Sequence, residues 1–110
     1  MVENSDHTDS VFRALADPTR RQLLERLAGG DMTVGELADP LQMTLAGASK
    51  HIGVLVDAGL VRQSKRGREK LCSLDPAGLL QVRDWVEHYS AFWKTRLDAL
   101  DAALKEDGDD

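Results

Sequence analysis

The sequence predicts a mainly α-helical fold with five helices and one small two-stranded β-hairpin. Apolar residues recur at spacings of three and four along most of the chain, which is typical of helices with one buried face. Helix-capping residues, prolines and glycines divide this pattern into separate segments. Only residues 61–74 combine short β-like segments with a central glycine, as paired strands do. With 110 residues, the chain is expected to form one domain with a modest core.

The domain is predicted over residues 9–106, between a disordered N-terminus (residues 1–8) and an acidic tail (residues 107–110). Its first helix is short, and Asp9 can cap it. The apolar residues of this helix are Val11, Phe12 and Leu15. A second helix is predicted in "DPTRRQLLERLAGG", where Asp17 can cap the first amides, Pro18 fits the first helical position and Gly29 can take the left-handed conformation that ends a helix.

Two further helices are predicted on either side of a tight turn. Thr33 and Glu36 have capping-box spacing at the start of the first, which should end near Pro40. Thr44 can cap the second, and Gly59 can stop it. The buried face of this second helix consists of Ala48, Ile52 and Leu55. Its opposite face consists of Ala46, Ser49, Lys50, Gly53 and Asp57.

Positive charge is concentrated just after these helices, although the whole chain has a net charge of -5. Residues 50–70 hold six cations and two anions, a net of +4, which leaves eight cations and 17 anions elsewhere, a net of -9. Within "VRQSKRGREKLCSL" the pattern predicts a hairpin with Gly67 in the turn and the cations near its tip. Such a local excess suits a polyanionic partner that approaches from one side.

The last helix is long and unusually apolar on one face. Asp75 and Pro76 repeat the cap-then-proline start. Both tryptophans, the one tyrosine and one of two phenylalanines lie on this helix, which is more apolar area than one side of a small domain needs. The surplus predicts a partner surface, and the simplest partner is a second copy of the chain. The residues predicted for this surface are Trp85, Tyr89, Phe92, Trp93, Leu97 and Leu100.

Two short helices joined by a tight turn and followed by a basic hairpin are the parts of a winged helix-turn-helix. In that arrangement the second helix of the pair enters the major groove of double-stranded DNA, and the hairpin, or wing, reaches phosphates or the minor groove. The residues predicted to contact DNA are Thr44, Ala46, Ser49, Lys50, His51, Arg62, Lys65, Arg66 and Arg68.

Over residues 10–104 the chain resembles the ArsR-type bacterial transcription regulators. The resemblance rests on "ALADPTRRQLLERL", "TVGELADPLQMTLAGASKHIGVLVDAGLV" and "RQSKRGREKLCSLDP", in this order and spacing. It implies a homodimeric repressor with the first and last helices in the interface, which adds Val11, Phe12 and Leu15 to that surface. It also implies DNA contacts from "SKHI" and from the wing arginines Arg66 and Arg68.

The chain departs from this family at its metal sites. Members that sense thiophilic metals carry Cys-Val-Cys where this chain has Thr33, Val34 and Gly35, which offer no thiolate. Zinc-sensing relatives place Asp-x-His and a later His pair on the last helix, at positions that here hold Trp85, Glu87, Asp98 and Asp101. Carboxylates without histidine make a poor zinc site and are more typical of a solvated helix face. No metal or other cofactor is therefore predicted.

Several alternatives stay open at this stage. A ligand or redox signal could act through the aromatic helix or through Cys72, although a cysteine on a hairpin strand is more often a packed residue. A protein interaction module that uses the aromatic helix alone would leave the wing cations unexplained. His51 could be a packed histidine or a phosphate donor, and Arg20 and Arg21 are interpreted as surface cations. The operator and the effector stay unknown.

Other classes of protein are less compatible with the sequence. It contains no glycine-rich phosphate loop, no nucleophile elbow and no credible metal cluster, so an enzyme is not predicted. No apolar run approaches the length needed to span a membrane, and the N-terminus lacks the apolar segment of a signal peptide, so the expected location is the cytoplasm.

Overall fold

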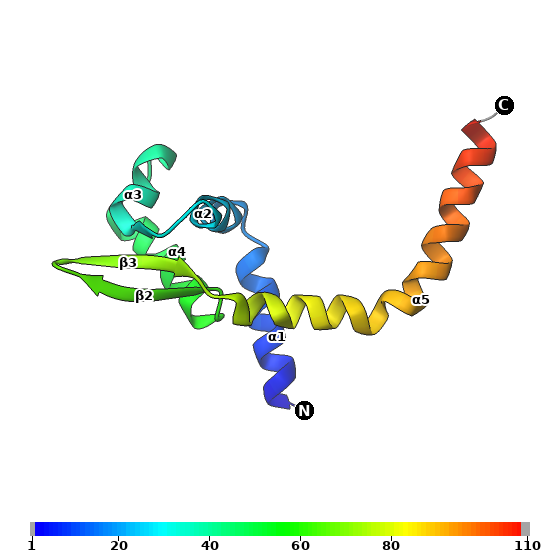
Figure 1. Cartoon of the computed structure of the whole chain (residues 1–110), viewed down its shortest axis with the longest axis horizontal. Coiled ribbons are helices and arrows are strands. Elements are labelled where there is room, and N and C mark those ends of the chain that lie inside the picture. Colours follow the sequence, from blue (N-terminus) through cyan, green and yellow to red (C-terminus); the bar gives the residue numbers. More distant parts are fainter. Residues whose placement is uncertain (1, 109–110) are drawn as a thin grey trace.

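The structure is a computed structural model that describes the backbone of residues 2–108 and the side chains of residues 7–106. It confirms a mainly helical fold with a small antiparallel sheet (Figure 1). The elements are α1 (Val2–Leu15), α2 (Pro18–Ala28), β1 (Met32–Thr33), α3 (Val34–Ala38), the 3-10 helix η1 (Asp39–Leu41), α4 (Leu45–Asp57), β2 (Val61–Arg66), β3 (Glu69–Leu74) and α5 (Pro76–Gly108).

The predicted helix caps are confirmed at four helices, including α5, where Asp75 Oδ1 accepts from the Ala77 amide at 3.0 Å. Asp17 Oδ1 accepts from the amides of Thr19 and Arg20, at 2.8 and 3.2 Å, at the start of α2. Thr33 and Glu36 form a complete capping box before α3. Thr44 Oγ1 accepts from the amide of Gly47 at 3.0 Å at the start of α4. Each cap satisfies amides that the first helical turn leaves without a partner, so these local sequences set the helix starts.

The glycines that end helices and turns follow the prediction with one exception. Gly59 after α4 and Gly67 in the hairpin turn have φ angles of +77° and +65°, in the left-handed region. Gly29 has φ -83°, so the prediction for this residue was wrong, and Gly30 carries the positive angle instead, at +142°. Helix α2 ends at Ala28, and Gly29 keeps a right-handed helical conformation as its C-cap. The backbone therefore takes the positive φ angle one residue later, at Gly30.

Both ends of the chain differ from the predicted boundaries. Helix α1 begins at Val2, so residues 2–8 are helical where a disordered N-terminus and a cap at Asp9 were predicted; Met1 lies outside the described residues. Thr8 Oγ1 donates to Gln81 Oε1 of α5 at 3.1 Å, a contact between segments far apart in sequence that local patterns cannot reveal. At the other end α5 continues to Gly108, within the predicted acidic tail, and residues 109–110 lie outside the described residues.

The sheet has three strands in the order β1-β3-β2, whereas the sequence pattern predicts only the β2–β3 hairpin. Met32 pairs with Cys72 and Thr33 pairs with Leu71. An N-cap residue has an extended backbone, and Thr33 has φ -74° and ψ 162°. The cap of α3 therefore also presents the chain in the conformation that pairs with β3.

One core holds α1, α2, α3, α4 and the base of the hairpin together. The buried residues that form it are Val11, Ala14, Leu23, Leu27, Leu37, Ile52, Leu55, Ala58, Leu60, Val61 and Cys72. Val11 was predicted for the dimer interface, but its side chain is 0% exposed and belongs to this core. The predicted stripe of α4 is confirmed, because Ala48, Ile52 and Leu55 are all buried.

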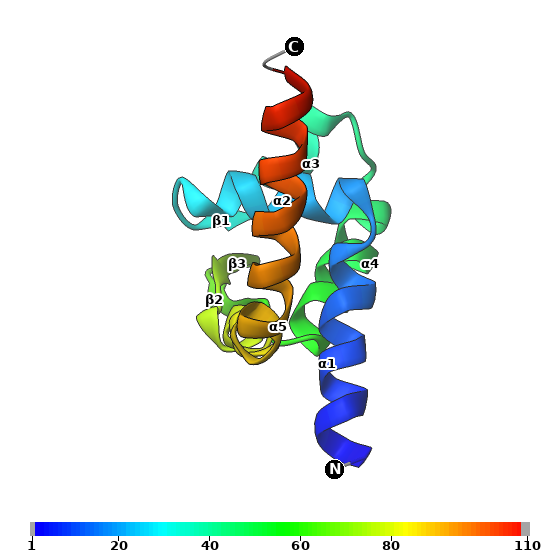
Figure 2. The ribbon, with the colours of Figure 1, turned by 90° about the vertical axis from the view of Figure 1, so that its right-hand side faces the viewer.

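Helix α5 carries the chain away from this core. Its first half passes beside α1, as Figure 2 shows in a view along it, and its second half turns and projects away from the other elements (Figure 1). Ser90 lies at the bend, where its hydroxyl donates to Glu87 O at 3.0 Å. A serine hydroxyl that bonds a carbonyl of the preceding turn is a known cause of helix bending. The molecule is therefore elongated, with extents of 61 × 39 × 20 Å.

Candidate nucleic-acid interface

Helix α4 presents a polar, exposed face opposite its buried stripe. Ala46, Ser49 and Lys50 are exposed on it, as the helical periodicity predicts. Thr44 is exposed too, and its oxygen accepts the capping bond from Gly47, so its hydroxyl hydrogen and one lone pair are left for a ligand. Leu45 adds an apolar side chain that is 63% exposed in the first turn. This face, formed by Thr44, Leu45, Ala46, Ser49 and Lys50, is called the reader face below.

The hairpin projects as a wing with its cations on both sides. Val61 pairs with Leu74 at its buried base, and Arg66 pairs with Glu69 next to the turn. Because side chains alternate along a strand, Arg62 and Arg66 share one side, while Lys65 shares the other with Lys70, directly across. All of these side chains and Arg68 are exposed. Like charges directly opposite destabilise a hairpin, so the Lys65–Lys70 pair favours an anionic partner.

A hollow of about 340 Å³ lies between the wing and the reader face. Leu45 and Ser49 line it from α4, and Glu69 and Lys70 line it from β3. Lys70 was not among the residues predicted to contact DNA. Its position could have been found from the two-residue turn at Gly67 and Arg68, which fixes the register and sets Lys70 opposite Lys65.

His51 is half-buried beside the reader face, where it contacts α2. Its Nδ1 lies 3.3 Å from Arg20 Nη1. The Arg20 side chain is only 15% exposed and also donates to Ala14 O at 2.7 Å and Arg13 O at 3.1 Å. The interpretation of Arg20 as a surface cation was therefore wrong, because its guanidinium joins α1, α2 and α4. Arg21 is exposed, as expected, and donates to Leu15 O at 2.6 Å.

The start of α3, where thiophilic-metal sensors of the resembled family carry cysteines, is occupied by a capping box. Thr33 is buried, and its Oγ1 accepts from the Glu36 amide at 3.2 Å. Glu36 Oε1 accepts from the Thr33 amide at 3.0 Å. Hydrogen bonds from the backbone and the hydroxyl of Thr33 lower the pKa of Glu36, in spite of its partial desolvation. The side chains at this position are thus engaged in holding the helix start.

The carboxylates of α5 pair with cations of the same helix. Lys94 Nζ lies 3.3 Å from Asp98, and Lys105 Nζ lies 3.3 Å from Asp101. Arg83 Nε lies 3.9 Å from Glu87. All three pairs are one helical turn apart and exposed, which is typical of a solvated helix face. Among the described residues, no three His, Cys, Asp or Glu side chains come together as a metal site would require.

Cys72 is fully buried in the core. Burial raises the pKa of its thiol, and this effect exceeds the opposing effects of the Gln63 amide, which donates to Sγ at 3.6 Å, and of Lys70. A buried thiol with a raised pKa is a poor nucleophile, so its environment is that of a packed residue.

A large apolar surface runs along α5 and includes part of α1. Phe12 and Trp85 pack edge to face at 5.6 Å between ring centroids, and Trp85 continues to Tyr89 at 4.9 Å. Phe92 and Trp93 form a second edge-to-face pair at 5.7 Å. Apart from Val11 and the half-buried Leu15, every residue predicted for the dimer interface is exposed. The exposed members are Phe12, Trp85, Tyr89, Phe92, Trp93, Leu97 and Leu100, here called the aromatic face.

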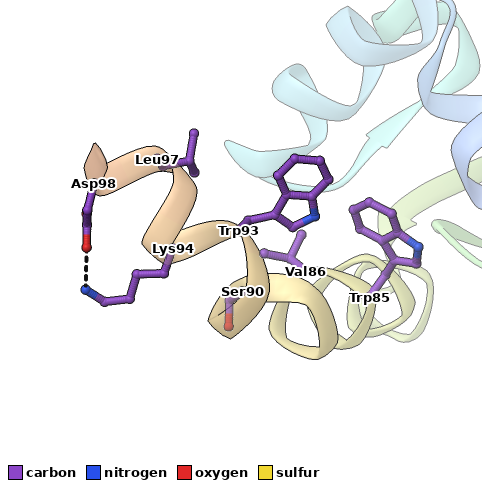
Figure 3. Close-up of a pocket in the computed structure, with 7 residues that line it drawn as sticks. All are labelled: Trp85, Val86, Ser90, Trp93, Lys94, Leu97 and Asp98. Atoms are coloured by element: carbon purple, nitrogen blue, oxygen red, sulfur yellow. Dashed lines mark hydrogen bonds and ion pairs between the residues drawn. The ribbon is translucent and has the colours of Figure 1, made fainter. Parts of the chain in front are cut away.

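A pocket of about 410 Å³ lies at the bend of α5, next to the aromatic face. Both indole rings lie on the same side of the helix, and the Ser90 side chain points away from them (Figure 3). Val86 and Leu97 complete its apolar lining, and the Lys94–Asp98 pair borders it.

None of the helices in the described part of the chain is long and apolar enough to cross a membrane.

Comparison with known proteins identifies the family. A family model described as a helix-turn-helix domain matches residues 15–64. The HTH-type transcriptional regulator Rv2034 of Mycobacterium tuberculosis is 38% identical over 102 residues, which cover 93% of this chain and 92% of that protein. The crystal structure of the ArsR family transcriptional regulator RHA00566 has a TM-score of 0.76 and 39% identity, over 82% of this chain and 93% of that one. This chain belongs to the ArsR family.

Two further matches bear on activity and assembly. The transcriptional repressor SdpR of Bacillus subtilis is 32% identical over 81 residues, which cover 74% of this chain and 90% of that protein. The solution structure of the homodimeric winged helix-turn-helix domain of Mb0332 from Mycobacterium bovis has a TM-score of 0.63 and 27% identity, over 77% of this chain and 84% of that one. The chain is thus an ArsR-family winged helix-turn-helix transcription regulator, and the helix-turn-helix match contains the reader face.

Proposed function

We propose that this protein is a homodimer that binds a specific double-stranded DNA sequence and represses transcription, including transcription of its own gene. The observation that carries the proposal is the coincidence of exposed cations with two elements, the reader face and the wing, on a chain that is otherwise acidic. Phosphates attract such a surface, while the acidic remainder of the protein is repelled from DNA.

Each element has a distinct role in this proposal. Ser49, Lys50 and Ala46 of α4 face the major groove, and Leu45 can contact a thymine methyl group. The wing arginines Arg62, Arg66 and Arg68, with Lys65 and Lys70, contact phosphates or the minor groove. Phosphate contacts supply affinity and register, and the α4 side chains supply sequence preference.

The second copy is expected to cover the aromatic face. Its large side chains are about half exposed in the single chain, including Trp93 at 47% and Leu97 at 58%. An apolar patch of this kind marks an interaction surface on a soluble protein. The homodimeric relative Mb0332 supports a second copy as the partner, and two reader faces would then address two half-sites of one operator.

Fluorescence anisotropy against two labelled duplexes tests this function. One duplex carries the DNA upstream of the protein's own gene, and the other is a scrambled sequence of the same composition. Tight binding with a preference for the upstream duplex and a steep dependence on salt is expected. Equal, weak binding to both duplexes would count against regulation of its own gene, and binding insensitive to salt would count against a DNA role for the wing.

A second candidate function is a response to an apolar small molecule. The concave pocket of about 410 Å³ at the bend of α5 favours it, because both tryptophans line that pocket. Ligand binding there would quench or shift tryptophan fluorescence and would weaken DNA binding in the same titration. A fluorescence change without an effect on DNA affinity would separate ligand binding from regulation.

A further inference from the structure

The Arg20 side chain links three elements of the DNA-binding domain. Its Nε and Nη2 donate to Ala14 O and Arg13 O, which are carbonyls at the C-terminal end of α1. Its Nη1 lies 3.3 Å from His51 Nδ1 on α4 and 3.9 Å from Asp17 Oδ2, the cap of α2. A guanidinium held by two backbone carbonyls and 15% exposed has little freedom to move, so it offers a fixed donor to α4.

The chemistry of this contact determines the state of the His51 ring. A guanidinium has five donors and no acceptor, so a hydrogen bond between Arg20 and His51 requires Nδ1 to accept. The neutral ring then carries its proton on Nε2. Nε2 has no hydrogen-bond partner in the described part of the chain. The one buried, unpartnered side-chain nitrogen or oxygen there is Arg26 Nε, so Nε2 of His51 reaches solvent.

The place of His51 on the helix gives this contact a second effect. His51 lies between exposed Lys50 and buried Ile52. Successive residues of a helix are separated by about 100° of rotation, so a contact at His51 limits rotation of α4 about its own axis. The exposure of Ser49 and Lys50 depends on that rotation.

We propose that Arg20 is a positioning residue for DNA recognition: it holds His51 as the Nε2–H tautomer and holds α4 in the orientation that presents the reader face. Nε2–H is then available to a DNA phosphate beside the major groove. This inference rests on the proposed function, because it assigns α4 to DNA, but the state of the His51 ring can be measured without DNA.

Long-range ¹H–¹⁵N correlation spectra of the free protein at about pH 8 test the ring state directly. The wild-type protein is expected to show the Nε2–H tautomer, and Arg20→Gln is expected to show a mixture of both tautomers. The matched control is Arg21→Gln, which also removes a cation that donates to an α1 carbonyl but leaves α4 untouched. An Nδ1–H tautomer in the wild-type protein would overturn the inference regardless of any DNA result.

DNA affinity tests the positioning role. Arg20→Gln is expected to weaken binding to the upstream duplex by about tenfold or more relative to Arg21→Gln, with equal affinities of both variants for the scrambled duplex. If both variants lose the same affinity for the upstream duplex, Arg20 contributes only its positive charge and does not position α4. Arg20→Lys, which retains the charge and one donor, should recover part of the affinity, and unfolding curves verify that each variant is folded.

A double-mutant cycle shows whether Arg20 acts through His51. In a His51→Leu background, Arg20→Gln should cause little further loss of affinity for the upstream duplex, because the acceptor is already gone. Additive losses would contradict the proposed route. The two proposals can fail separately. If the Nε2–H tautomer is present but the wild-type protein does not prefer the upstream duplex, the proposed function is contradicted for that DNA. The positioning role of Arg20 in recognising that DNA is then contradicted too.

Discussion

Gly78, at the start of α5, lies where this helix approaches the backbone that follows α4. Its amide donates to Gly59 O at 2.8 Å, directly after α4. A Cβ atom at Gly78 would lie 2.8 Å from that carbonyl oxygen and 2.8 Å from Leu60 Cδ2. Real Cβ atoms do not approach backbone atoms so closely, so a glycine is required for α5 to leave the core in its present direction.

We therefore expect Gly78→Ala to lower the free energy of unfolding by about 1–3 kcal/mol, because the junction of α4, β2 and α5 must shift. Urea unfolding followed by circular dichroism measures the change. Gly53→Ala is the matched control, since a Cβ at Gly53 meets no atom within 4 Å and α4 gains a better helix former. The control should be neutral or stabilising by up to about 1 kcal/mol. Equal changes in the free energy of unfolding for both variants would show that the close approach at Gly78 does not constrain the residue there.

Glu36 links stability to pH. Its pKa lies below its ordinary value in the folded protein, so the unfolded chain binds a proton more readily. The stabilisation is therefore present above the unfolded pKa and is lost as pH falls through the folded pKa.

Glu36→Gln keeps an acceptor for the Thr33 amide but cannot titrate. We expect the variant to lose less stability than the wild-type protein between about pH 5 and about pH 3, measured by urea midpoints. Glu25→Gln, at an exposed carboxyl of α2, should follow the wild-type curve; parallel curves for all three proteins would contradict the role of the capping box.

Among the elements, the wing carries the densest positive charge. Arg66 and Arg68 lie beside and within its turn, and Lys65 faces Lys70 across the strands. No carboxylate within salt-bridge distance pairs with these four side chains in the described part of the chain. Arg66 helps to lower the pKa of the Glu36 carboxyl, but the four cations form no ion pair, whereas the lysines of α5 are paired with aspartates.

Replacement of both Arg66 and Arg68 by alanine is expected to weaken binding to every duplex by a similar factor. The slope of log affinity against log salt should fall by up to about two, because two phosphate contacts and their released counterions are lost. The salt titration by anisotropy described above provides the measurement. Lys94→Ala with Lys105→Ala removes the same charge from α5 and should leave the slope unchanged. An unchanged slope in the wing variant would show that Arg66 and Arg68 do not contact DNA phosphates.

The molecule as a whole is an elongated shape with a small core at one end and an apolar helix at the other. The second half of α5 has no other element of the described chain beside it, and it carries Phe92, Trp93, Leu97 and Leu100 exposed (Figure 1). One protomer does not bury this face, because the second half of α5 projects away from the other elements (Figure 1). A second copy could bury it and would relate two wings by a two-fold axis.

Trp93→Ala is accordingly expected to raise the dissociation constant of the homodimer by about tenfold or more, since buried aromatic residues dominate interface energetics. Sedimentation velocity over a range of protein concentrations measures it. Leu45→Ala, which truncates an exposed apolar residue on α4, should leave the dimer unchanged. A wild-type protein that sediments as a monomer at all concentrations would contradict the homodimer.

Local patterns were sufficient for most of the helical fold. Asp17, Thr33 and Thr44 start their helices because an N-cap depends on a side chain and amides two or three residues away. The hairpin turn at Gly67 and the buried stripe of α4 also follow from short-range geometry and periodicity. The exposure of Ser49, Lys50 and the wing cations could be predicted for the same reason.

Contacts between distant segments decided the remaining features. The additional turns of α1 involve Thr8 and Gln81, and β1 exists because Met32 meets Cys72. The sequence pattern placed Arg20 on the surface, but α1, α2 and α4 pack around its guanidinium. It placed Val11 in the dimer interface, but the side chain of Val11 is buried in the core. The sequence alone thus determined the starts of α2, α3 and α4, the hairpin turn and the charge segregation, because these depend on neighbours along the chain. Which polar groups meet across the core is set by the packing of whole elements, which no short segment encodes.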